Sequence, residues 1–210
     1  MKKSLISSAL SVLLSTIAVG AHATDFNVLS NSLSTATFTS EALLETVTGT
    51  STAVTGTITT DLNDASKTTG SISFPVTSLS TGIDMRDEHL HSAQWLNAAE
   101  FPNITFAIKS LNVTSANKKF THGAAVDAQV TGDITIHGVT KSVTVPVRAT
   151  YYEITNPQIA GTAYLDGNVL RIETSFKINA SDFGISIPEP LRTKVSNELS
   201  LTVRVTAKQG

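Results

Sequence analysis

Apolar and polar residues alternate along most of this 210-residue chain, and this pattern constrains the fold more than any other feature. Side chains on an extended strand point alternately to opposite faces, so alternation with period two predicts a strand with one apolar face. The pattern is clearest in residues 142–151 and 199–207. Threonine, which favours strands over helix interiors, contributes 31 residues. The sequence therefore predicts an all-β protein.

The same alternation recurs in five further segments and, less regularly, in residues 26–47. The five segments are 54–60, 71–79, 104–113, 124–136 and 170–178. About eight strands, each with one apolar face, must bury those faces together, and a closed barrel does so without leaving an exposed sheet edge. An open β-sandwich is the alternative that the pattern leaves open.

Residues 84–100 (DMRDEHLHSAQWLNAAE) break the alternation. They contain good helix formers, and Pro102 follows them, so we expect one or two short helices inserted between strands. This segment also holds the densest cluster of charged and histidine side chains and the only tryptophan, Trp95. We expect Trp95 to pack the helical segment onto one end of the barrel.

Residues 1–23 are predicted to be a cleaved signal peptide. Lys2 and Lys3 form a positive start, the stretch from Leu5 to Val19 is apolar, and Ala21-His22-Ala23 fits a cleavage site. The apolar stretch is shorter than the about 20 residues that a transmembrane helix needs. We therefore expect a bacterial protein of one domain, residues 24–210, in the periplasm or outside the cell, without a transmembrane anchor.

Composition and missing motifs exclude several classes of function. The chain has no cysteine, so thiol catalysis, disulfides and cysteine-based zinc sites are absent. Its 15 basic and 17 acidic residues include no basic block, which argues against nucleic-acid binding. No phosphate-binding loop, dinucleotide fingerprint, serine-hydrolase elbow or zinc-protease motif occurs. We expect no cofactor and no metal.

The one cluster that suggests chemistry is Arg86, Asp87, His89 and His91. A small-molecule enzyme at the barrel mouth would use these residues. However, residues two apart on a helix point to different sides, and a zinc site needs three or four converging ligands. Catalysis here is therefore the least favoured of the alternatives.

Three separated segments together resemble the YceI-like family of exported bacterial proteins. Residues 80–106 contain Thr-Gly, Arg-Asp-Glu-His-Leu and Pro-Asn-Ile-Thr-Phe; residues 130–141 contain Gly-Asp-Ile-Thr-Ile-His-Gly-Val-Thr-Lys; and residues 178–185 read Ile-Asn-Ala-Ser-Asp-Phe-Gly-Ile. The resemblance implies a lipocalin-like antiparallel β-barrel over most of residues 24–210. It is compatible with a homodimer.

The resemblance further implies that an isoprenoid-type chain, polyprenyl or quinone-like, lies in an apolar tunnel through the barrel. Inward apolar residues of the predicted strands would line it: Phe74, Phe106, Ile134, Ile136, Val143, Val145, Val147, Leu201 and Val203. A head group at the mouth would meet Arg86, His89 and Trp95. The alternative is a structural or stress-response barrel that acts through a protein partner, since the same side chains would also fill a solid core.

Overall fold

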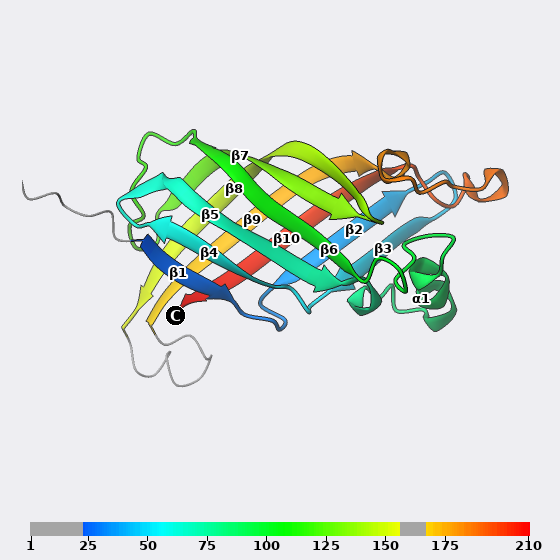
Figure 1. The fold of residues 1–210 in the computed structure, drawn as a ribbon, viewed down its shortest axis with the longest axis horizontal. Coiled ribbons are helices and arrows are strands. Elements are labelled where there is room, and N and C mark those ends of the chain that lie inside the picture. The colour runs from blue at the N-terminus through cyan, green and yellow to red at the C-terminus, as the bar shows by residue number, and fades with distance from the viewer. Residues whose placement is uncertain (1–22, 156–166) are drawn as a thin grey trace, which may run out of the picture.

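The structure, a computed structural model, describes residues 23–155 and 167–210. The predicted signal peptide therefore lies outside the described residues, apart from Ala23. Ten strands form one antiparallel sheet in the described ranges (Figure 1). They are β1 Ala23–Val28, β2 Thr35–Glu41, β3 Thr46–Ser51, β4 Thr55–Asp61, β5 Asp64–Pro75, β6 Asn103–Val113, β7 Ala125–Ile136, β8 Val139–Ile154, β9 Gly167–Asn179 and β10 Glu198–Gln209.

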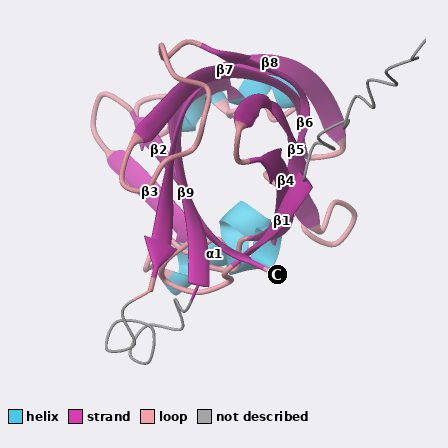
Figure 2. Cartoon of the chain, turned by 90° about the vertical axis from the view of Figure 1, so that its left-hand side faces the viewer, coloured by secondary structure: helices cyan, strands magenta, loops and turns pink. Residues whose placement is uncertain are grey.

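Eight of these strands close into a barrel, which confirms the predicted architecture and rules out the open sandwich. Their order around the barrel is β1-β4-β5-β6-β7-β8-β9-β10, and β10 pairs back onto β1. Figure 2 looks into this ring from the end opposite the helix α1 (Asp84–His91). The alternation in the sequence reflects this closure, because every strand turns one face to a shared interior.

The hairpin β2–β3 extends the barrel wall at one end. Strand β10 pairs with β2 over Leu199–Arg204 and with β1 only over its last residues, from Ala207. A bridge between Thr50 and Ser80 connects β3 to the chain just before α1. Residues 26–47, which showed the least regular alternation, thus contribute three short strands, and two of them lie outside the eight-stranded ring.

The predicted strand 71–79 differs from the structure at both ends. Strand β5 begins seven residues earlier, at Asp64, and a register shift between Thr59 and Asp61 disturbs its pairing with β4. Ala65 and Thr68 are both buried, but they are three residues apart, so they do not fit an alternation with period two. The sequence pattern therefore does not reveal this part of the strand. At the other end, Val76–Ser78 is a 3-10 helix, η1, whose first amide donates to the carbonyl of Pro102.

The expected helical segment contains one α-helix, α1, followed by turns up to residue 100. Two further 3-10 helices were not predicted: η2 (Ala180–Phe183) and η3 (Glu189–Leu191). Together with α1 and the β2–β3 turn, these segments gather at one end of the barrel (Figure 1). We call this the α1 end.

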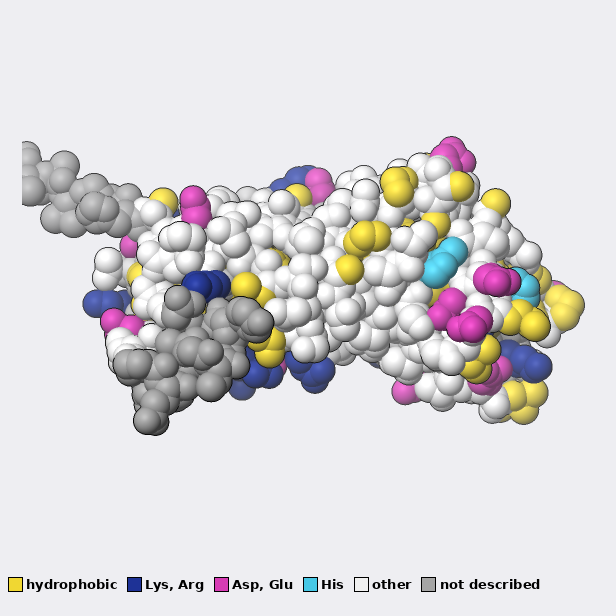
Figure 3. Space-filling model, turned by 90° about the horizontal axis from the view of Figure 1, so that it is seen from below, with side chains coloured by type: hydrophobic (Ala, Val, Ile, Leu, Met, Phe, Trp, Pro, Cys, Tyr) yellow, Lys and Arg dark blue, Asp and Glu magenta, His cyan; other side chains and the backbone are white. Residues whose placement is uncertain are grey.

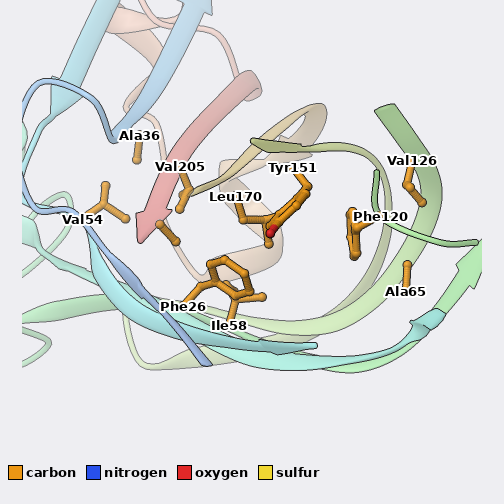
Figure 4. Packing of buried hydrophobic residues seen from close by; sticks show 11 residues of the cluster. Phe26, Ala36, Val54, Ile58, Ala65, Phe120, Val126, Tyr151, Leu170 and Val205 are labelled. Atoms are coloured by element: carbon orange, nitrogen blue, oxygen red, sulfur yellow. The ribbon is translucent and has the colours of Figure 1, made fainter. Parts of the chain in front are cut away.

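Two buried apolar clusters occupy the barrel ends. The cluster at the far end includes Phe26, Tyr151 and Leu170, and the rings of Phe26 and Tyr151 meet edge to face with centroids 6.5 Å apart (Figure 4). The cluster at the α1 end includes Leu96 and Phe183. Buried apolar side chains thus lie toward both ends of the barrel.

The β7–β8 turn offers a test of how the barrel is built. His137 and Gly138 both have positive φ, 51° and 73°, as the tight two-residue hairpin turn requires. A Cβ on Gly138 would lie 2.4 Å from the ring of Phe101, whereas a Cβ on Gly123, with the same φ, would meet nothing. Gly138 is therefore required for space as well as for conformation.

Gly138→Ala is expected to lower the free energy of unfolding by about 2–5 kcal/mol, the sum of backbone strain and overpacking. Gly123→Ala, the matched control, should cost only the strain, about 1–2 kcal/mol. Urea unfolding followed by circular dichroism measures both. Equal losses in the two variants would show that the contact with Phe101 contributes nothing.

Candidate functional site

A cavity of about 430 Å³ lies inside the barrel, and members of both apolar clusters line it. Its wall includes inward side chains of strands β2 to β10 together with residues of α1 and of segment 189–196. The volume falls within the roughly 300–1,000 Å³ typical of small-molecule sites. The described part of the barrel is therefore hollow at its centre.

The burial of individual side chains agrees with a hollow interior. Phe74, Phe106 and Val203 face inward and line the cavity, yet each is only half-buried. In a filled core such side chains would touch neighbours on every side and be fully buried. Val205 and Ala207, further along β10 toward the far end, are fully buried.

The structure brings most of the predicted wall residues to this cavity. Eight of the nine line it: Phe74, Phe106, Ile134, Ile136, Val145, Val147, Leu201 and Val203. Val143 is not among the lining residues; it packs against the cluster at the α1 end, which includes Phe183. The remaining three predicted residues, Arg86, His89 and Trp95, also lie at the cavity wall.

Other lining residues did not emerge from the sequence. Phe176 and Ile178 belong to a predicted strand, so their alternation could have identified them. Phe38 lies in the less regular N-terminal region, and Phe183 lies in a 3-10 helix that has no period-two pattern. Only the tertiary structure places these two aromatic rings at the cavity.

Among the described residues, the ionisable side chains that border the cavity all lie at the α1 end. They are Glu45, Arg86, His89 and Lys194. The guanidinium of Arg86 donates to Glu45 Oε1 at 2.9 Å and to Thr81 Oγ1 at 2.9 Å. The Lys194 ammonium has no ion pair or hydrogen bond within the described ranges. The cavity is thus apolar along its length and polar at one mouth.

Asp87 has a structural role at this mouth. Its carboxylate accepts hydrogen bonds from the Ser80 hydroxyl (2.7 Å), the Thr81 amide (2.7 Å) and the Thr81 hydroxyl (2.5 Å). Burial alone would raise the pKa of Asp87, but the hydrogen bonds from Thr81 and Ser80 outweigh it, so the pKa lies below its usual value. Asp87 therefore fixes the loop that leads into α1.

The two histidines of the same cluster also do not converge on one point. His91 Nε2 lies 2.9 Å from the carbonyl oxygen of Leu79, while His89 is exposed. Among the described residues, no group of three or more His, Asp or Glu side chains could hold a metal ion. No helix in the same part of the chain has the length and apolarity to cross a membrane.

Asp87→Asn is expected to lower the free energy of unfolding at neutral pH by about 1–3 kcal/mol. The amide has only one acceptor oxygen and no charge, so it cannot accept the three hydrogen bonds that the carboxylate accepts. The pKa of Asp87 is lower in the folded than in the unfolded state. Its contribution is therefore present above about pH 3.9 and is lost as the pH falls through the folded pKa. Urea unfolding near neutral and near acidic pH measures the difference.

The matched control for this variant is Asp84→Asn, an exposed carboxylate in the same helical turn. It should change the free energy of unfolding little at either pH. A deficit of Asp87→Asn that persists undiminished at acidic pH would contradict the assigned role of the carboxylate.

Fold and cavity together define a hollow antiparallel barrel with one charged mouth. The sequence profile of the YceI-like domain matches residues 28–207, and the chain belongs to the YceI-like family. Protein YceI of Escherichia coli O6:H1 (strain CFT073) is 37% identical over 93 residues, 44% of each chain. A UPF0312 protein of Enterobacter sp. (strain 638) is 33% identical over 115 residues, 55% of this chain and 50% of that protein. The matches thus span about half the length of these curated relatives.

Solved structures share the fold at low sequence identity. A polyisoprenoid binding domain from Saccharophagus degradans has a TM-score of 0.67 at 14% identity and covers 90% of this chain and 100% of its own. BcnA from Burkholderia cenocepacia has a TM-score of 0.66 at 20% identity, and the match covers 83% of this chain and 96% of BcnA. At these identities the likeness establishes the barrel architecture.

Proposed function

We propose that this protein is an exported lipid-binding protein that encloses an isoprenoid-type chain, polyprenyl or quinone-like, in the barrel cavity. It would carry, store or sequester that lipid in the bacterial periplasm or outside the cell, with no catalytic step. One observation carries the proposal: an apolar cavity inside the barrel whose charged lining side chains, among the described residues, all lie at one mouth. The Saccharophagus degradans domain of the same fold, described as polyisoprenoid binding, supports it.

The physical basis is hydrocarbon burial. Each CH₂ removed from water contributes about 0.8 kcal/mol, so an apolar cavity can bind a long tail without hydrogen bonds. The wall offers mainly aliphatic and phenyl side chains, such as Ile108, Phe106 and Val203. A polar head would remain at the α1 end, near Lys194 and the paired Arg86. The ligand class that fits is therefore an amphiphile with one long apolar tail.

Both alternatives fit the structure less well. A purely structural barrel gains nothing from a central void, because unfilled space forfeits packing energy. For an enzyme at the mouth, Arg86, Asp87 and His91 would have to be available, but each is engaged in contacts that hold the α1 end together. Lipid binding is the function that uses the cavity.

Protein purified from its native host is expected to release a stoichiometric prenyl lipid or quinone on organic extraction, identified by mass spectrometry. The intact protein should have the mass of a chain that begins at Thr24. When ubiquinone-10 is added to the delipidated protein at a free concentration of about 100 times its dissociation constant, the free energy of unfolding should rise by about 2.7 kcal/mol. For a domain of this size, that corresponds to a rise of roughly 5–10 °C in melting temperature. An empty extract together with no thermal shift would overturn the proposal.

Ala149→Phe tests whether the cavity itself is the binding site. Ala149 lines the cavity from β8, so the phenyl ring would occupy the void. Overpacking a filled core lowers the free energy of unfolding by about 1–3 kcal/mol, and we expect a smaller loss here. We also expect at least a several-fold loss of ubiquinone-10 uptake. Uptake is measured by extraction of protein recovered after incubation with the quinone.

Ala107→Phe is the matched control, since Ala107 is exposed on the outer face of β6. It should leave ubiquinone-10 uptake unchanged. Undiminished uptake by a folded Ala149→Phe protein would place the ligand outside the cavity, whereas severe destabilisation would indicate a filled interior.

A further inference from the structure

Four of the six exposed large apolar side chains in the described ranges lie around the mouth of the cavity. Leu43 and Leu44, in the β2–β3 turn, are 83% and 69% exposed, and Ile83 and Met85, at the start of α1, are 53% and 69% exposed. Figure 3 shows hydrophobic side chains clustered at the right-hand end, which is the α1 end of Figure 1. We call these four side chains the apolar rim.

Specific contacts hold the rim in place. The Arg86–Glu45 ion pair, at 2.9 Å, connects α1 to the β2–β3 turn. The amide of Leu44 donates to the carbonyl of Thr193 at 2.8 Å, which connects the same turn to the segment after η3. Arg86 and Glu45 also line the cavity. The rim is therefore a fixed border of the opening rather than a set of unrelated exposed residues.

We propose that the apolar rim inserts into the interface of a zwitterionic phospholipid bilayer and that the barrel takes up its lipid from there. The inference rests on the proposed function, because a bilayer is the phase in which a long-tailed amphiphile resides. Insertion at the rim would bring the cavity mouth to the acyl boundary, so that a tail could pass from bilayer to barrel without crossing water.

The size of the rim favours a lipid interface over a second copy of the chain. An aromatic side chain can bury about 150–250 Å² of surface, and an aliphatic side chain buries less. A stable protein interface buries about 800 Å² on each partner. The four partly exposed aliphatic side chains of the rim fall short of that area. Interfacial anchoring has no such threshold, since each apolar side chain that enters the acyl boundary contributes separately.

The charges at the rim specify the kind of bilayer. Arg86 is paired with Glu45, and Arg192 with Glu189 at 3.0 Å, so these cations are neutralised. Lys194 remains, and α1 adds the exposed carboxylates Asp84 and Glu88 to the same end of the barrel. A surface of mixed sign gains nothing from anionic lipid, so binding should depend on apolar insertion and respond weakly to salt.

The test is flotation of the protein from residue 24 onward with phosphatidylcholine vesicles on a density gradient. We expect the protein to float with the vesicles, with no gain on adding phosphatidylglycerol or lowering the salt. The combined variant Leu43→Ser, Leu44→Ser, Met85→Ser should lose about tenfold or more in vesicle partitioning, because its apolar insertion is removed. All three positions are exposed, so a melting curve should confirm an intact fold.

Leu33→Ser is the matched control. Leu33 is 41% exposed, and its carbonyl accepts a hydrogen bond from the Thr206 hydroxyl on β10. Thr206 lies seven residues along β10 from Leu199, which lines the cavity at the α1 end. Leu33 is therefore about 23 Å from that end, measured along the strand. It should partition like the unaltered protein. Equal loss in the control, or no flotation of the unaltered protein, would overturn the inference. The inference would also be overturned if light scattering showed that the unaltered protein is a dimer and that the combined variant is a monomer.

A second readout separates this inference from the proposed function. Ubiquinone-10 is supplied either from detergent micelles or from phosphatidylcholine vesicles, and uptake is measured by extraction. The combined variant should load normally from micelles and slowly from vesicles. If the unaltered protein floats but loads from neither source, the proposed function fails; if all proteins load equally fast from vesicles, the rim has no role in uptake.

Discussion

Pairing between the first and last strands of the barrel is the constraint on which the rest of the structure depends. Strand β1 joins β10 through only three residue pairs, Phe26–Gln209, Asn27–Lys208 and Val28–Ala207. The remainder of that edge of β10 is taken by β2. Without this closure the inward apolar faces of eight strands would be open to water. With it, they surround one shared interior.

Closure also explains why the interior is hollow where it is. At the far end, Phe26 and Tyr151 fill the bore, and at the α1 end side chains from outside the barrel wall, such as Leu96 and Phe183, narrow it and face the cavity. Between them small strand residues such as Ala128 and Ala149 leave room. The cavity is thus the space that the two clusters leave unfilled.

The α1 end combines structural and functional demands in the same few side chains. Arg86 lines the cavity while it connects α1 to the β2–β3 turn, and Asp87 fixes the loop before it. The sequence-based interpretation of Arg86 and His89 as residues of the mouth remains a prediction, although both lie at the cavity wall. Most polar groups there are already satisfied within the fold, which makes Lys194 the cation most available to a bound head group.

The sequence by itself determined the all-β architecture and the position of the helical insertion, because period-two alternation and strand length are local properties of the chain. It favoured a closed barrel but left an open sandwich as the alternative, and the pairing of β1 with β10 decided for the barrel. It also indicated the inward faces, so that most wall residues could be named in advance. Only the tertiary structure decided whether those faces meet or leave a void, since packing depends on how residues distant in sequence share one volume. For the same reason, it alone placed Phe38, Phe183 and Lys194 at the cavity and Leu43 beside its mouth.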